Sequence, residues 1–211
     1  MNIPSQELKK TTYQNNLIEL KKRSEFFASQ ITEAELPENY QIIETKTGDI
    51  TASIEVEDKK LLLHSKYDPV KEAKRSIDIF DKEPEILIIG GIGLGYATEA
   101  AVESMPKVKI LVLEKDLSFF KLALTLRDLR SIISNKNIEF IITEKGEEAI
   151  QILQDLNTKN IAIALHRPST EIYPDTYKNI SKLVNSFVNS REINIATLSR
   201  FQKLWTKNIL N

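Results

Sequence analysis

The sequence predicts an α/β protein with a Rossmann-like, doubly wound and mostly parallel β-sheet, preceded by a small antiparallel β meander and an N-terminal helix. Short apolar runs such as Ile86 to Ile89 alternate with stretches of helical period, as in parallel strands joined by crossover helices. Ahead of them, residues 50–57 alternate apolar and polar side chains, which is typical of a half-buried strand. Four of the six glycines fall within residues 90–95, so a sharp strand-to-helix turn is expected there.

The first 66 residues are expected to form an annex to this core. Residues 5–29 contain good helix formers and few apolar positions, which predicts one polar helix docked by one end. After Leu36 and Pro37 the period changes, and three strands joined by tight turns are predicted. These strands span residues 40–45, 50–57 and 60–64. We divide the chain into an N-terminal helix and antiparallel β annex, residues 1–66, and a Rossmann-like α/β domain, residues 67–211.

The elements of the second part follow in βα order. Asp68 and Pro69 have the residue types of a helix N-cap and a first helical position, and Asp116 predicts a second N-cap. Core strands are expected at 86–89, 108–113, 138–142 and 161–165 and, shorter, at 193–195; helices are expected at 69–80, after the glycine loop, at 117–127, at 146–156, from 174 and from about 196. Right-handed crossovers would place the carboxyl ends of these strands along one rim, where ligands of such sheets bind.

That rim is the candidate ligand site. Glu114 ends the second core strand, 23 positions after Gly91, where a Rossmann-like fold contacts the ribose of a nucleotide. His166 follows the fourth strand and is either an acid, base or phosphate contact or a structural histidine. The nucleotide-binding residues that we predict are Gly91, Gly93, Gly95 and Glu114, joined at the rim by His166 and Arg167 and flanked by Thr143 and Glu144.

The spacing of the loop narrows the ligand class. Tyr96 stands where a dinucleotide fingerprint has its third small residue, which disfavours NAD, and Gly95 is not followed by Lys and Ser or Thr, which excludes a P-loop. The remaining pattern resembles the first motif of S-adenosylmethionine-dependent methyltransferases and of aminopropyltransferases. Against such an enzyme, we count five core strands where the methyltransferase sheet has seven. The third alternative is an interaction scaffold in which the glycines serve packing alone.

Composition excludes several other classes. With 29 basic and 30 acidic residues, the net charge of −1 gives no reason to expect nucleic acid or an anionic membrane as a partner. No apolar stretch approaches a membrane span or a signal peptide, so a cytoplasmic protein is expected. The absence of cysteine excludes disulfides and thiolate catalysis. His64 and His166 lack ligand spacing, so we expect no metal site, and we expect His64 to be structural. No nucleophile and base stand at a spacing that assigns catalytic residues.

Several motifs together resemble a known family. They are Leu62 to Ala73, the glycine loop with Tyr96, the segment Leu113-Glu114-Lys115-Asp116, Arg127-Asp128-Leu129, His166 to Ser169 with Tyr173-Pro174, and Leu204 to Leu210. This pattern, which spans most of the chain after residue 40, resembles the motility accessory factor family, bacterial proteins associated with flagellin glycosylation. Two positions depart from the family pattern, namely Lys115, where proline is expected, and the additional Gly90, so a ligand role for Glu114 is left open.

The resemblance implies a function. Members of the family are similar to sialyltransferases in their central domain and transfer a nonulosonic acid, such as pseudaminic or legionaminic acid, from its CMP-activated form to Ser or Thr of flagellin. The likeness reaches only the N-terminal part of such proteins. It therefore implies a glycosyltransferase as the parent protein, flagellin and a missing C-terminal catalytic domain as partners, and a chain that is inactive alone. The nucleotide expected at the rim is a CMP-sugar or, in the alternative, S-adenosylmethionine.

Overall fold

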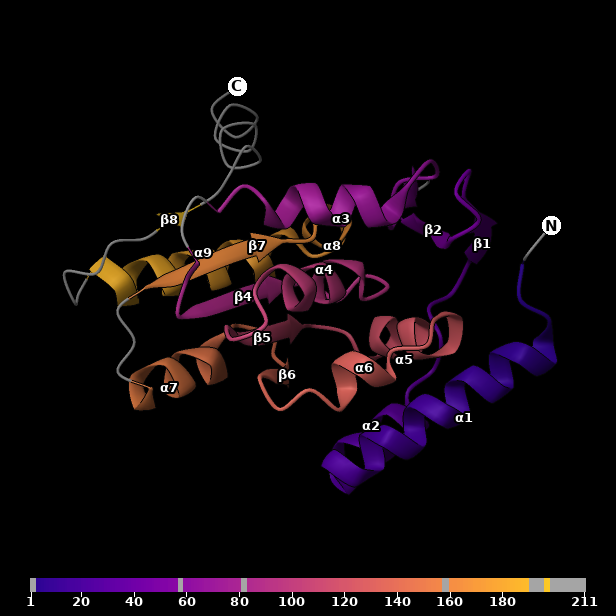
Figure 1. The fold of residues 1–211 in the computed structure, drawn as a ribbon, viewed down its shortest axis with the longest axis horizontal. Coiled ribbons are helices and arrows are strands. Elements are labelled where there is room, and N and C mark those ends of the chain that lie inside the picture. Colours follow the sequence, from indigo (N-terminus) through magenta and orange to yellow (C-terminus); the bar gives the residue numbers. More distant parts are fainter. Residues whose placement is uncertain (1–2, 57–58, 81–82, 157–159, 190–195, 198–211) are drawn as a thin grey trace.

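The computed structural model describes residues 3–56, 59–80, 83–156, 160–189 and 196–197. Within these ranges the chain forms a five-stranded parallel sheet and a separate three-stranded antiparallel sheet (Figure 1). The parallel sheet contains β4 (Ile86–Gly90), β5 (Lys109–Glu114), β6 (Ile138–Ile142), β7 (Ile161–Leu165) and β8 (Ala196–Thr197). The antiparallel sheet contains β1 (Tyr40–Glu44), β2 (Ile50–Val56) and β3 (Lys59–Leu62). The expected fold class is confirmed.

Helices cover both faces of the parallel sheet. In chain order, those that the structure describes are α1 (Gln6–Arg23), α2 (Glu25–Glu33), α3 (Pro69–Ile77), α4 (Tyr96–Ser104), α5 (Leu117–Leu126), α6 (Arg130–Ile133), α7 (Glu147–Asp155), α8 (Arg167–Ile172) and α9 (Pro174–Asn189). The predicted caps are present, since the side chain of Asp68 accepts a hydrogen bond from the amide of Lys71 and that of Asp116 from the amide of Ser118. None of the described helices has the length and apolar character needed to cross a membrane.

The parallel sheet has the order β6-β5-β4-β7-β8, so the chain moves outward from β4 to one edge and then crosses to the other. This is the doubly wound topology that the alternation of strands and helices predicts. In the register of the sheet, Gly90 lies opposite Leu113 on one side and Leu165 on the other. The strand ends therefore lie level, and the segments that follow β4, β5 and β7 meet at one rim.

The two faces of the sheet carry different apolar clusters. Leu87 and Ile89 of β4 belong to a large cluster with residues of α1 to α6, and Ile86 and Ile88 belong to a second cluster with residues of α7 and α9. Because successive residues of a strand point to opposite faces, a run that is buried on both faces is apolar throughout. This explains why the core strands could be predicted from short apolar runs.

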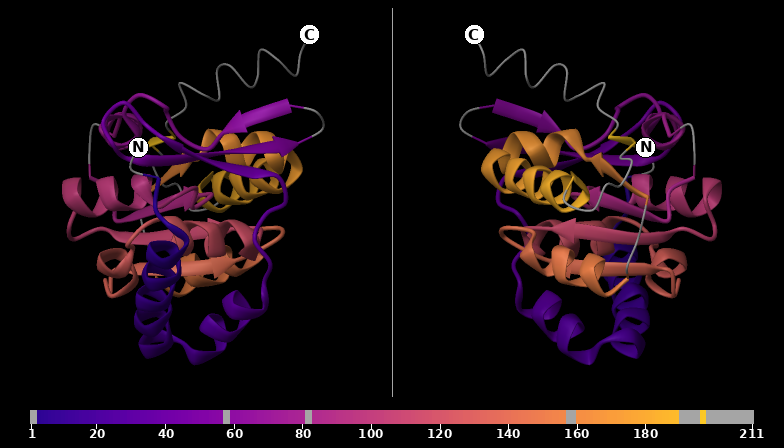
Figure 2. Two further views of the ribbon diagram at one scale, coloured as in Figure 1. Left: turned by 90° about the vertical axis from the view of Figure 1, so that its right-hand side faces the viewer. Right: turned by 90° about the vertical axis from the view of Figure 1, so that its left-hand side faces the viewer.

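The antiparallel sheet, which we call the β annex (β1–β3), packs on the same large cluster. Ala52 of β2 and Leu63, which follows β3, are buried in this cluster together with Leu87 of the parallel sheet. Figure 2 shows the annex at one end of the molecule and the α1–α2 pair at the other. The predicted domain boundary at residue 66 stays a prediction. One apolar cluster contains residues from both sides of that boundary.

The N-terminal region differs from the expectation of a single helix over residues 5–29. Ser24 has extended backbone angles, φ −154° and ψ 109°, which end α1 and begin α2. Its amide donates to Leu20 O at 2.9 Å, and its hydroxyl accepts from the amide of Phe27 at 3.1 Å. Ser24 thus serves as C-cap of α1 and as N-cap of α2, and serine is a favoured residue at the second of these positions.

Other differences concern short elements. The helices α6 and α8 were not expected, because neither has more than six residues and neither shows a helical period. Ala196 and Thr197, where a final helix was expected to begin, form β8 instead. The strand expected at 193–195 and the rest of the helix expected from residue 196 lie outside the described residues.

Candidate functional site

The glycine loop connects β4 to α4 and turns sharply. Gly91, Gly93 and Gly95 have φ angles of 89°, 52° and 85°, in the left-handed region that favours glycine. The amide of Gly91 donates to Leu113 O, and that of Gly95 donates to Ile92 O, both at 2.8 Å. The loop is therefore tied to the end of the neighbouring strand and to itself, as a tight strand-to-helix turn requires.

Glu114, the predicted ribose contact, is buried and fully engaged by the chain. It is 1% exposed, and its Oε2 accepts from the amide of Ile92 at 3.0 Å. Its Oε1 accepts from the amides of Lys115 and Asp116 at 2.8 and 3.2 Å and from the hydroxyl of Tyr177 at 3.1 Å. Burial raises the pKa of Glu114, and the backbone hydrogen bonds oppose this rise. A ribose at this carboxylate would have to replace bonds that already hold the loop to β5.

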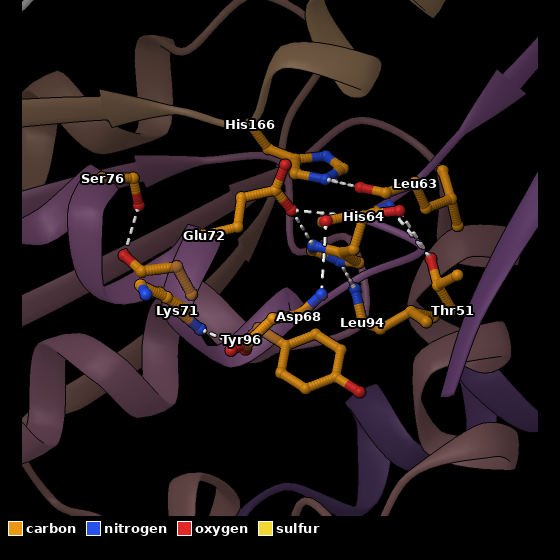
Figure 3. A network of polar contacts seen from close by, with 12 residues as sticks. Thr51, Leu63, His64, Asp68, Lys71, Glu72, Ser76, Leu94, Tyr96 and His166 are labelled. Atoms are coloured by element: carbon orange, nitrogen blue, oxygen red, sulfur yellow. Dashed lines mark hydrogen bonds and ion pairs between the residues drawn. The ribbon is translucent and has the colours of Figure 1, made fainter. Parts of the chain in front are cut away.

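His64 reaches the loop from the β annex (Figure 3). Its Nε2 accepts a hydrogen bond from the amide of Leu94 at 2.8 Å, so the proton of the neutral ring is on Nδ1, which lies 3.8 Å from Oε2 of Glu72. The ring packs edge-on against Tyr96, with centroids 5.0 Å apart. Thr51 of β2 bonds both the amide and the carbonyl of His64 through its hydroxyl, which fixes the backbone at this point.

His166 reaches the same place from the end of β7. Its Nε2 lies 2.6 Å from the carbonyl oxygen of Leu63, which can only accept, so this nitrogen carries the proton. Its Nδ1 then accepts from the hydroxyl of Ser169 at 2.8 Å. The rings of His64 and His166 lie 4.7 Å apart between centroids. Burial lowers the pKa of both histidines, and burial together with the charge of a protonated His64 lowers the pKa of His166 to about 3.

These side chains fill the space over the glycines. A Cβ at Gly93 would lie 2.6 Å from Nε2 of His64 and 2.8 Å from Nε2 of His166. A Cβ at Gly91 would lie 2.5 Å from Cβ of Ser169, and Ser169 is itself buried. The glycines at 91 and 93 are thus needed so that the chain's own histidines and serine can approach the loop.

Arg127 holds the loop from a further direction. Its guanidinium donates to Leu94 O at 2.9 Å and to Glu99 at 2.7 Å, and it lies 3.6 Å from the centroid of the Tyr96 ring. The hydroxyl of Tyr96 donates to Ile50 O of the annex at 2.7 Å. The residue that breaks the dinucleotide fingerprint is therefore a bridge between α4 and β2.

The structure brings together only part of the predicted rim. Gly91, Gly93, Glu114 and His166 lie at one site, with His64 added from the annex. Arg167 is mostly exposed and pairs with Glu171, one turn along α8. Gly95 faces Leu129, Thr143 bonds Glu148, and the exposed Glu144 lies 4.0 Å from Lys115.

Two residues of the site were not predicted to belong to it. His64 was expected to be structural, and nothing in its sequence context links it to a loop 30 positions away. The sequence pointed to Arg127 only as part of the family motif Arg127-Asp128-Leu129. Across the described residues there is no group of three or more His, Asp or Glu side chains that could hold a metal ion. The nucleotide role of Gly91, Gly93, Gly95, Glu114, His166 and Arg167 stays a prediction.

Comparisons with known proteins agree with the resemblance found in the sequence. Residues 5–181 match the family model described as glycosyltransferase Maf N-terminal domain. An uncharacterized protein of Treponema pallidum (strain Nichols) is 25% identical over 179 residues, which are 83% of this chain and 60% of that protein. The chain thus spans less than two thirds of the length of this curated relative.

Solved structures support the fold. The structure of the MAf glycosyltransferase from Magnetospirillum magneticum AMB-1 matches with a TM-score of 0.58 and 12% identity, over 85% of this chain and 35% of that one. A precorrin-6y C5,15-methyltransferase from Geobacter metallireducens GS-15 matches with a TM-score of 0.41, too low to carry an argument. The family model covers most of the chain, and we conclude that this chain belongs to the glycosyltransferase Maf N-terminal domain family.

Proposed function

We propose that this chain acts as the N-terminal module of a flagellin-modifying glycosyltransferase. In this proposal a separate catalytic domain transfers a CMP-activated nonulosonic acid to Ser or Thr of flagellin, and the present module binds flagellin without transferring sugar. The match to the Maf N-terminal domain over residues 5–181 supports this assignment. The coverage of 35% of the solved MAf glycosyltransferase is consistent with a module of a larger enzyme.

One observation supports a module that binds no donor nucleotide. Four backbone amides of the glycine loop, which would receive a nucleotide, donate hydrogen bonds within the chain. The loop amides of Gly91, Ile92, Leu94 and Gly95 donate to Leu113 O, Glu114, His64 and Ile92 O, respectively. A donor nucleotide would have to break several of these bonds, each of which costs free energy when a buried group is left unpaired. We infer that the module works without a nucleotide in this loop.

A transfer assay tests the first part of the proposal. Unmodified flagellin is incubated with the purified chain and a CMP-activated nonulosonic acid, and the intact mass of flagellin is measured. The mass is expected to stay unchanged, whereas a full-length member of the family, as positive control, adds the mass of the sugar. A sugar-sized increase produced by this chain alone would show that it contains the transferring residues.

A binding assay tests the second part. Unmodified flagellin monomer is immobilised, and the purified chain is passed over it in a biolayer interferometry experiment. We expect saturable binding that does not require a CMP-sugar in the buffer. If the folded chain gives no signal up to a concentration of about 100 µM, any binding is weaker than about −5.5 kcal/mol and contact with flagellin is not its role.

A further inference from the structure

The glycine loop and the β annex are joined by a pair of histidines that come from distant parts of the chain. His64 follows the last strand of the annex, and His166 begins α8 at the carboxyl end of β7. Each ring crosses to the other element: His64 accepts from Leu94 in the glycine loop, and His166 donates to Leu63 in the annex. Figure 3 shows the two rings facing each other between these partners.

The contact of His64 with Leu94 depends on the neutral form of the His64 ring. The amide of Leu94 can donate to Nε2 of His64 only while that nitrogen keeps its lone pair. A proton on Nε2 would place two donors against each other, 2.8 Å apart. It would also place a positive charge 4.7 Å from the ring of His166, in a site where His64 is buried and His166 is partly buried.

Charged groups around the two histidines shift the pKa of His64 in both directions. Glu72 of α3, whose side chain is half exposed, faces Nδ1 of His64 and favours the charged form of the ring. Arg127, which follows α5, disfavours that charged form. Arg167 of α8 acts on Glu72, and Tyr96 of α4 contacts His64 with a ring whose pKa is raised to about 12 by burial, so the phenol stays neutral. Glu72 is thus the one acidic group among these neighbours.

We propose that His64 and His166 form a histidine latch, which holds the β annex on the glycine loop while both rings are neutral and releases it when His64 gains a proton. Release frees the amide of Leu94 and uncovers Gly93, so that the loop becomes accessible to solvent or to a ligand only in the open state. The latch is a conformational device and does not depend on the proposed function.

The chain has only two histidines, so imidazole NMR reports on the latch alone. In the ¹⁵N-histidine-labelled chain at pH 7.5 we expect two different tautomers, Nδ1–H for His64 and Nε2–H for His166. We expect both rings to resist protonation at pH values where a free histidine, with a pKa near 6.5, is largely charged. Two rings that titrate near pH 6.5 as free histidines do would overturn the proposal.

Hydrogen exchange measures the opening itself. Between pH 7.5 and pH 5, the exchange of amides in β2 and of Leu94, corrected for the intrinsic effect of pH, is expected to rise about 30-fold for one released histidine. Amides in the centre of β4 and β5 are expected to keep their protection, because the parallel sheet stays folded. If the annex and the central strands lose protection together, the chain unfolds globally and contains no latch.

Two variants separate the latch from general acid sensitivity. His64→Gln keeps an acceptor oxygen for Leu94 but does not titrate, so the rise in exchange between pH 7.5 and 5 is expected to vanish. Glu72→Gln keeps an acceptor for the amide of Ser65 and removes the charge that favours a protonated His64 in the closed state, so the rise in exchange is expected to be at least as large as in the wild type. An unchanged pH profile in folded His64→Gln would contradict the role of His64.

Discussion

At the scale of single residues, Glu114 shows how a predicted ligand contact can be occupied by the protein. The carboxylate ends β5 where a ribose contact was expected, and both of its oxygens already accept hydrogen bonds from the chain. A carboxylate can accept at two oxygens, which a buried corner with donors on both sides requires. The residue type at this position is therefore explained by the closure of the loop on β5, without a ligand.

The Glu114→Gln variant tests this explanation. Glutamine has one acceptor oxygen, and its amide group would face a backbone N–H on the other side, so one buried donor loses its partner. We expect the free energy of unfolding in urea to fall by about 1–3 kcal/mol. Glu144→Gln, at an exposed position after β6, is the control and is expected to change it by less than about 0.5 kcal/mol. Equal effects at both positions would mean that the bonds of Glu114 do not stabilise the fold.

Gly93 and Gly48 form a second matched pair. Both have positive φ, 52° and 84°, but a Cβ at Gly48 has nothing within 4 Å, whereas one at Gly93 meets His64 and His166. Gly48→Ala is expected to cost about 1–2 kcal/mol, the strain of the left-handed backbone alone. Gly93→Ala is expected to cost at least about 2 kcal/mol more, because two packed imidazoles must shift. Thermal and urea unfolding measure both, and an equal loss would show that the space over Gly93 is not filled.

At the scale of elements, α1 is held by polar contacts more than by an apolar face. Asn16 is buried, its Nδ2 donates to the carbonyls of Leu124 and Arg127 at 2.7 Å each, and its Oδ1 accepts from the amide of Leu129 at 2.8 Å. These partners lie where α5 ends, so one side chain satisfies backbone groups that the helix end leaves unpaired. Arg23, the last residue of α1, donates to backbone carbonyls near β6.

Removing the side chain of Asn16 is expected to loosen α1. Asn16→Ala leaves two carbonyls and one amide without a partner, at an expected cost of about 2–4 kcal/mol in the free energy of unfolding. Asn15→Ala is the control, since Asn15 is exposed on the same helix, and it is expected to be nearly neutral. Urea unfolding compares the two, and hydrogen exchange in α1 shows whether the loss is local. A neutral Asn16→Ala would mean that α1 is held by its apolar contacts alone.

The sequence predicted elements well where one physical signal dominates. The core strands β4 to β7 are apolar because both faces are buried, and Asp68 and Asp116 are ordinary N-caps. The break at Ser24 was missed because both flanking segments are rich in helix-forming residues. The helix α8 was missed because its N-cap is His166, a residue outside the usual set of capping side chains.

At the scale of the whole molecule, the two histidines, His64 buried and His166 partly buried, make stability depend on pH. The pKa of each is lowered in the folded chain, first by burial, and that of His166 falls to about 3. The unfolded chain, with histidine pKa values near 6.5, therefore binds more protons as acid is added, and stability is full above about pH 6.5 and lost as pH falls below it. Glu114 acts oppositely, since its raised pKa makes its contribution fall as pH rises.

The expected change in the free energy of unfolding with pH follows from this linkage between protonation and folding. Between pH 7.5 and 5, each histidine that stays neutral in the folded chain lowers the free energy of unfolding by about 2 kcal/mol, so the pair gives about 2–4 kcal/mol. Urea unfolding at the two pH values measures this difference, and the double variant His64→Gln, His166→Gln is the control that should lose most of it. A wild-type chain that is equally stable at both values would contradict burial of neutral rings.

The candidate site could be predicted only in part. The order of strands and helices was enough to place Gly91, Glu114 and His166 at one rim, because parallel strands end on the same side. The position of His64 beside the glycine loop could not be predicted. It depends on how the β annex packs on the parallel sheet, and no local sequence pattern encodes that packing. In the proposed latch the same contact controls access to the loop, so the sequence alone left the nucleotide and scaffold alternatives unresolved.

Calorimetric titration at pH 7.5 tests the central claim, that the module works without a nucleotide in its glycine loop. The purified chain is titrated with CMP, a CMP-activated nonulosonic acid and S-adenosylmethionine, beside Arg167→Ala at the rim and Arg130→Ala on α6, two exposed arginines that each pair with a nearby carboxylate. We predict no saturable heat with any ligand. Micromolar binding that Arg167→Ala weakens and Arg130→Ala does not would contradict the account and make the rim a nucleotide site.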